Sequence, residues 1–158
     1  MKDLEQMLEL LEQKRLYFLH YEKEMEALPY LPAEDMEACV ERGGLIVEKI
    51  RETEGRLGRL VKQNGPLAIS AVNHECERGQ LPPDLGKLYD ASMAVKAVAV
   101  RIMGNDDLIR RRIAWERDQA MERLKELNSR SQSIAGRYQR STQTGVTGVS
   151  PDWTPRNA

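Results

Sequence analysis

The chain has 158 residues, a length typical of one domain, with 31% charged and only 5% aromatic residues. So few large rings argue against a compact globular core, and the abundant Leu, Glu, Ala, Arg, Met and Gln favour helices. The formal net charge of −1 argues against a dedicated nucleic-acid binder. No apolar run approaches the roughly 18 residues of a membrane span, and the N-terminus lacks a signal-peptide core, so we expect a cytoplasmic protein without membrane insertion.

The first predicted helix spans residues 2–28. Heptads counted from Leu4 place apolar residues at seven of eight seam positions, with Lys14 as the exception. The seam is Leu4, Met7, Leu11, Lys14, Phe18, Tyr21, Met25 and Leu28. Pro29 and Pro32 end this helix, because proline donates no backbone hydrogen bond.

The second predicted helix spans residues 33–63 and ends at Asn64-Gly65-Pro66. Gly43 and Gly44 interrupt its apolar stripe, at a cost of about 1 kcal/mol each relative to Ala. The pair indicates either a close helix–helix approach or a hinge. Residues 67–76 predict a short connecting helix.

The third predicted helix runs from Leu85 to Tyr138, with one soft spot at Gly104-Asn105 where it could kink or divide. A continuous helix of this length would be roughly 80 Å long. These elements predict an all-α, elongated antiparallel bundle of three long helices over residues 1–138. Residues 139–158, mostly Ser, Thr, Gly, Pro and Gln, predict a flexible polar tail in which Trp153 is the strongest anchor.

Charge is unevenly distributed along the chain. Residues 2–28 hold seven acids and four bases, whereas residues 108–138 hold eight bases and four acids. Two interpretations follow: the two helices pack antiparallel and neutralise each other, or the basic helix faces an acidic partner.

No catalytic motif is present. His20 lies beside the apolar seam and lacks the neighbours of a phosphotransfer histidine, and His74 and Cys76 are too few for a structural zinc site. The sequence therefore predicts no enzyme, no cofactor and no metal.

Three stretches together resemble a known family. They are LEQMLELLEQK at residues 4–14, MEACVER at 36–42 followed by LIVEKI at 45–50, and NDDLI at 105–109 with a long helix closing at Gly136-Arg137-Tyr138. In this order they resemble the FlgN-like flagellar export chaperones, which guard hook–filament junction proteins before type III secretion. The resemblance covers about residues 1–145.

The resemblance implies a chaperone that binds the amphipathic C-terminal helices of hook-associated proteins and delivers them to the flagellar export gate. Helix-in-groove recognition along the last helix would keep those apolar faces from aggregating. The residues expected to bind the partner are Leu108, Ile109, Ile113, Ala120, Leu124, Leu127, Ile134 and Tyr138. The alternative is a structural coiled-coil adaptor or homodimer without a role in secretion.

Overall fold

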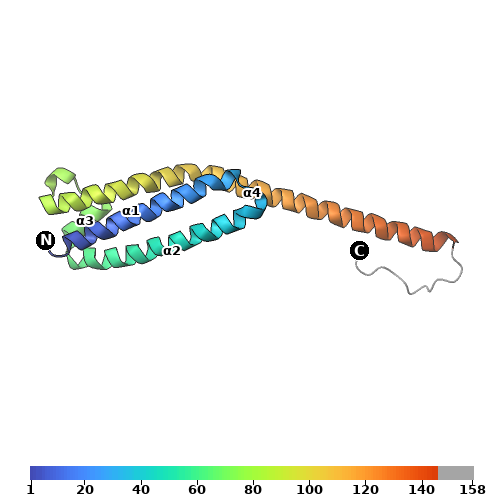
Figure 1. The fold of residues 1–158 in the computed structure, drawn as a ribbon, viewed down its shortest axis with the longest axis horizontal. Coiled ribbons are helices and arrows are strands. Elements are labelled where there is room, and N and C mark those ends of the chain that lie inside the picture. The colour runs from blue at the N-terminus through green and yellow to red at the C-terminus, as the bar shows by residue number, and fades with distance from the viewer. Residues whose placement is uncertain (146–158) are drawn as a thin grey trace. The chain divides into compact units, whose positions relative to one another are not determined.

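The computed structural model describes the backbone of residues 1–145 and the side chains of residues 1–138. Over this part of the chain the fold is all-α, without a strand (Figure 1). The helices are α1 (Leu4–Ala27), α2 (Ala33–Gln63), α3 (Pro66–Asn73) and α4 (Pro83–Gly145), and two short 3-10 helices span Leu28–Tyr30 and Arg78–Gln80. The contacts divide the chain into two units: unit 1, Met1–Arg112, and unit 2, which begins at Ile113.

The predicted bounds of the second helix, 33–63, are confirmed. Pro32 precedes α2, and Glu34 and Asp35 in its first turn complement the positive end of the helix dipole. Gly65 then joins α2 to α3 with φ +93°, a left-handed conformation that glycine adopts without a steric penalty. The connecting helix is shorter than predicted, because His74 also takes a left-handed conformation and closes α3 after Asn73.

Helix α4 does not break at Gly104, since the helix continues through it and Asn105. A lone glycine weakens a helix but keeps its backbone N–H donor, unlike proline. The predicted helix end at Tyr138 is wrong, because α4 continues to Gly145. Gln139 and Arg140, good helix formers, explain why the backbone does not stop at Tyr138. The flexible tail predicted beyond residue 145, with Trp153, lies outside the described residues.

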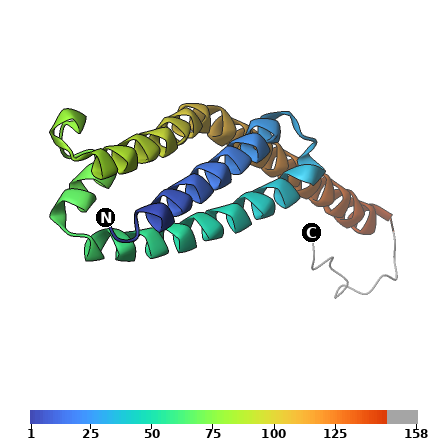
Figure 2. The ribbon, with the colours of Figure 1, turned by 60° about the vertical axis from the view of Figure 1, so that its left-hand side comes forward.

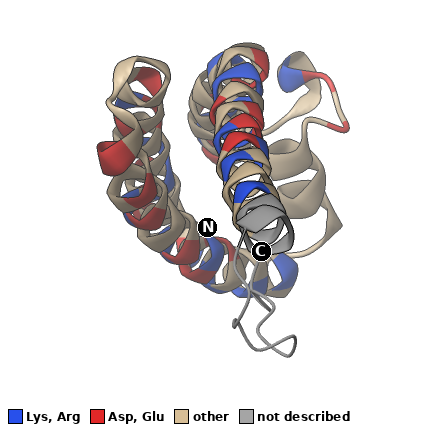
Figure 3. Cartoon of the chain, turned by 90° about the vertical axis from the view of Figure 1, so that its right-hand side faces the viewer, with Lys and Arg blue, Asp and Glu red and all other residues tan. Residues whose placement is uncertain are grey.

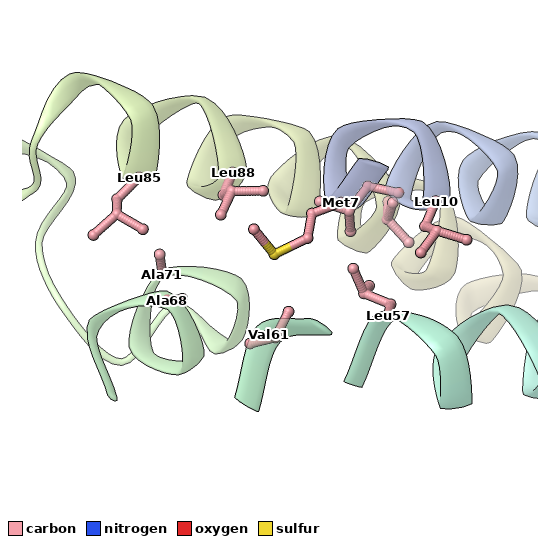
Figure 4. Packing of buried hydrophobic residues seen from close by; sticks show 10 residues of the cluster. Met7, Leu10, Leu57, Val61, Ala68, Ala71, Leu85 and Leu88 are labelled. Carbon is pink, nitrogen blue, oxygen red and sulfur yellow. The ribbon is translucent and has the colours of Figure 1, made fainter. Parts of the chain in front are cut away.

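Unit 1 brings α1, α2, α3 and the first part of α4 side by side (Figures 1 and 2). Its main core joins buried residues from all four helices (Figure 4): Met7, Leu10, Leu11, Leu57, Val61, Ala68, Ala71, Leu85, Leu88 and Val95. Met7 and Leu88 are fully buried, and Ala68 and Ala71 let α3 lie close to its neighbours.

A second apolar cluster joins the end of α1 to the start of α2 through Met25, Leu28, Met36 and Cys39. Burial, opposed in part by Arg42 and reinforced by Glu24, raises the pKa of the Cys39 thiol, which donates to the Glu24 carbonyl 3.3 Å away. This cysteine is therefore a packing residue in its neutral form.

The order of the ion pairs along the helices shows the relative directions of the helices in unit 1. Lys14 pairs with Glu54 at 2.9 Å and Glu24 with Arg42 at 3.1 Å, so α1 and α2 run antiparallel. Glu22 pairs with Arg101 at 3.0 Å, and the Met1 ammonium lies 3.2 Å from Asp84, so α1 and this part of α4 run in the same direction.

The two adjacent glycines of α2 have different surroundings. A Cβ added at Gly43 would lie 2.6 Å from Met25 Cε and 3.4 Å from Tyr21, whereas one added at Gly44 would meet nothing within 4 Å. Gly43 is therefore the glycine of the pair that leaves room for side chains of α1, whereas Gly44 faces open space.

Candidate helix-docking surface

Helix α4 carries an uninterrupted heptad pattern from Ile113 to Tyr138. Eight positions with alternating spacings of four and three residues, called the seam below, lie along one side of the helix. They are Ile113, Arg117, Ala120, Leu124, Leu127, Ser131, Ile134 and Tyr138. Six of the eight are apolar or aromatic, which is the pattern of a helix that packs against another helix.

The large side chains of the seam are exposed to solvent. Ile113 is 45% exposed, Leu124 56%, Leu127 59%, Ile134 60% and Tyr138 55%. A single exposed Leu is ordinary on a protein surface, but a row over nearly four heptads that is interrupted only by Arg117 and Ser131 is not. The seam is about 40 Å long at 1.5 Å per residue, enough to accommodate a partner helix of similar length.

The two flanks of the seam differ in charge. In the heptad register, one flank consists of the residues that directly precede positions 117, 124, 131 and 138, which are Glu116, Arg123, Arg130 and Arg137. The other flank consists of the residues that directly follow positions 113, 120, 127 and 134, which are Ala114, Met121, Asn128 and Ala135. We name Arg123, Arg130 and Arg137 the arginine edge, and the second set the uncharged edge. Figure 3 shows charged positions recurring along this stretch of α4.

The structure groups six of the eight residues that the sequence nominated for partner binding: Ile113, Ala120, Leu124, Leu127, Ile134 and Tyr138. Ile109 instead packs against the Met25 and Leu28 cluster of unit 1. Leu108 is exposed but lies five residues before Ile113, about 140° around the helix from it. Met121 and Trp115 are also exposed, but they were not among the residues predicted to bind the partner. The heptad register places Met121 beside the seam and Trp115 away from it.

Two acidic residues near the end of α1 pair with arginines of unit 1. Glu22 and Glu24 pair with Arg101 and Arg42, and both arginines lie outside the basic stretch 108–138. Within that stretch, Arg110 pairs with Asp106 and Lys125 with Glu122, along the same helix. In contrast, the arginine edge makes no ion pair with any side chain of residues 1–138.

The hollows and the potential metal ligands of the described residues are weaker candidates for a binding site than the seam. A hollow of about 260 Å³ between α1, α2 and α3 is lined by Leu57, Val61, Ile69 and Val72 and bordered by the Lys14–Glu54 pair. This volume falls below the ~300–1,000 Å³ usual for small-molecule sites. A larger hollow, of about 530 Å³, lies at the N-terminus, but Asp3, Glu5, Gln6 and Glu9 line it together with Met1 and Leu4, unlike the mostly apolar lining of such sites. No group of three or more potential metal ligands occurs among the described residues.

The two histidines also lie apart from any cluster of reactive groups. His20 is exposed on α1, with its Nε2 atom 3.8 Å from Glu24. His74 packs edge-on against Tyr89, with ring centroids 5.0 Å apart, and burial together with the charge of Lys96 lowers its pKa. Both positions fit structural roles.

Comparisons with protein-family models, curated proteins and solved structures found no match for this chain. Among the described helices, none combines the length and the low polarity that crossing a membrane would require.

Proposed function

We propose that this protein is a cytoplasmic export chaperone that holds the amphipathic C-terminal helices of hook-associated flagellar proteins against the seam of α4. It prevents those helices from assembling prematurely and delivers them to the flagellar type III export apparatus. In this proposal α1, α2 and the first part of α4 form the predicted antiparallel three-helix bundle, which serves as the scaffold. No covalent step is required, because the bound protein exchanges one helix partner for another.

The observation that carries the proposal is the exposure of a regular heptad seam. Leu124, Leu127 and Ile134 are each more than half exposed, although their spacing is that of a helix interface. Burying them against an amphipathic helix would remove apolar surface from water at about 25 cal/mol per Å². The three-part sequence resemblance to FlgN-like chaperones supplies the identity of the partner.

The proposal is tested by substituting Leu127→Asp in the full chain. A carboxylate in the seam would have to be buried against the apolar face of the partner, so binding should fall by at least tenfold. The measurement is a titration with the C-terminal helical segments of hook-associated proteins from the same genome.

Val100→Asp is the matched control. Val100 lies on the same helix and is 57% exposed, close to the 59% of Leu127, but it belongs to unit 1. Binding should be unchanged in this variant, and both variants should melt cooperatively. Equal affinity of Leu127→Asp and the unsubstituted chain would contradict the proposal.

The second candidate is a homodimer or structural adaptor, favoured by the same exposed seam. In that case light scattering would report a stable dimer, and Leu127→Asp would convert it to a monomer. A monomeric unsubstituted chain would exclude this candidate.

A further inference from the structure

We propose that the seam of α4 selects an acidic-edged amphipathic helix: a partner whose apolar stripe is flanked by Asp or Glu on the side that meets the arginine edge. This inference rests on the proposed helix-docking function and specifies the chemistry of the partner. It concerns the flanks of the seam, whereas the proposed function concerns its apolar centre.

The geometry of a packed helix pair places the flanking columns next to the partner. In heptad packing, the residues on either side of the apolar seam cover its edges and lie within ion-pair reach of the facing helix. Arg123, Arg130 and Arg137 recur every seven residues, so they form one such column over the last two-thirds of the seam.

The charge of this column is available to a partner. Arg123, Arg130 and Arg137 make no ion pair with any side chain of residues 1–138, unlike Arg110 and Lys125 on the same helix. Guanidinium groups bind carboxylates in a bidentate geometry, so a partner with acids at the facing positions gains up to three pairs.

The other edge is built differently. Ala114, Met121, Asn128 and Ala135 carry no charge, and the alanines are small enough for a second helix to approach closely. The partner therefore needs acids along one flank only, and its other flank can be apolar. This asymmetry fixes how a partner helix is rotated on the seam.

A second copy of this chain is a poorer occupant. In a parallel pair each flanking arginine meets the uncharged edge of the other chain, so Arg123 would face Asn128 and Arg130 would face Ala135. Arg117, which lies within the seam, would face its own copy, and two facing cations repel. In an antiparallel pair centred on the seam, Arg123 would face Arg130, which repels it, and Glu116 would face Arg137, which attracts it, so the flanks would give no net attraction.

The test uses the full chain and two synthetic amphipathic peptides of four heptads with Leu and Ile seams. One peptide has Glu at every flanking position and the other has Lys, so each repels its own copies. Exposed ion pairs typically change affinity by about two- to fivefold each, so the Glu peptide should bind at least about tenfold more tightly. The difference should shrink as salt is raised.

Charge reversal supplies the decisive variant. Arg123→Glu combined with Arg130→Glu and Arg137→Glu should invert the preference, so that the Lys peptide binds more tightly. Because unfolding could lower both affinities but could not invert their order, this result is independent of stability. As a matched control, Lys125→Glu, which lies off both edges, should alter the ratio of affinities less than Arg130→Glu does.

The outcomes separate this inference from the proposed function. Equal affinities for the two peptides, both lost in Leu127→Asp, would overturn the acidic-edge inference and leave helix docking intact. A clear preference for the Glu peptide without binding to hook-associated helices would support the inference and refute the proposed partner. A stable dimer that binds neither peptide would overturn the inference, because a second copy would then occupy the seam.

Discussion

The two parts of α4 share one helix and one apolar period, yet they have opposite exposures. In unit 1, Leu88 is fully buried and Val95 is 6% exposed, whereas Leu127 and Ile134 in unit 2 are 59% and 60% exposed. The difference lies in the neighbours: in unit 1 the stripe meets α1, α2 and α3. A helical period therefore indicates a face that another element can cover, but it does not tell which element covers it.

Hydrogen exchange should show the largest contrast. Amides in the part of α4 around Leu88 and Val95 should be protected up to the global free energy of unfolding, typically about 5–15 kcal/mol. Amides between Ile113 and Tyr138 should exchange far faster, because the apolar side chains of this stretch are exposed and most helical stability in proteins comes from packing of an amphipathic face. Adding a partner helix should slow exchange in the second group of amides. Equal protection of the two groups in the free chain would contradict this prediction.

A matched pair of truncations tests the same contrast through stability. Leu88→Ala should lower the free energy of unfolding by about 2–5 kcal/mol, since it leaves a cavity in a packed core. Leu127→Ala should change it by less than about 0.5 kcal/mol, because the side chain is exposed in the free protein. Urea unfolding followed by circular dichroism measures both, and a large loss in Leu127→Ala would reveal a partner already present.

Substitutions at the two adjacent glycines of α2 test the packing within unit 1. Gly43→Leu should destabilise the protein by about 1–3 kcal/mol, because the new side chain must displace Met25 and Tyr21. Gly44→Leu should be neutral or stabilising by up to about 1 kcal/mol, since it removes a helix-weakening glycine in open space. The melting temperature should therefore fall in Gly43→Leu and should stay unchanged or rise in Gly44→Leu.

The smallest expected effect is the pH dependence that His74 of unit 1 contributes to stability. The pKa of His74 is lowered in the folded state, so the unfolded chain binds the proton first. Its contribution to stability is complete above its ordinary value of 6.5 and declines as the pH falls below it.

His74→Asn should weaken this dependence between about pH 7 and pH 5, since Asn tolerates the left-handed backbone found there. Unfolding curves at the two ends of that range provide the measurement. An undiminished slope in the variant would assign the dependence to other groups.

Much of the fold followed from local signals. Pro32 and the Asn64-Gly65-Pro66 run bound α2 where predicted, and the all-α class followed from composition and helical period. The predicted end of α4 at Tyr138 was wrong because the change in composition after Tyr138 does not coincide with the end of the helix: Gln139 and Arg140 still favour a helix, and α4 continues to Gly145. Part of the seam could also be found from the sequence, since its spacing is visible there.

The bounds of α2, six of the eight seam positions and the excess of basic residues along them follow from the amino-acid sequence alone, because they depend on local signals and on residue spacing along one helix. Only the tertiary structure decided that Ile109 packs into unit 1 while Leu127 is exposed, and that Gly43 rather than Gly44 leaves room for side chains of α1. The physical reason is that periodicity is a property of a single helix, whereas burial depends on which other helices lie against it.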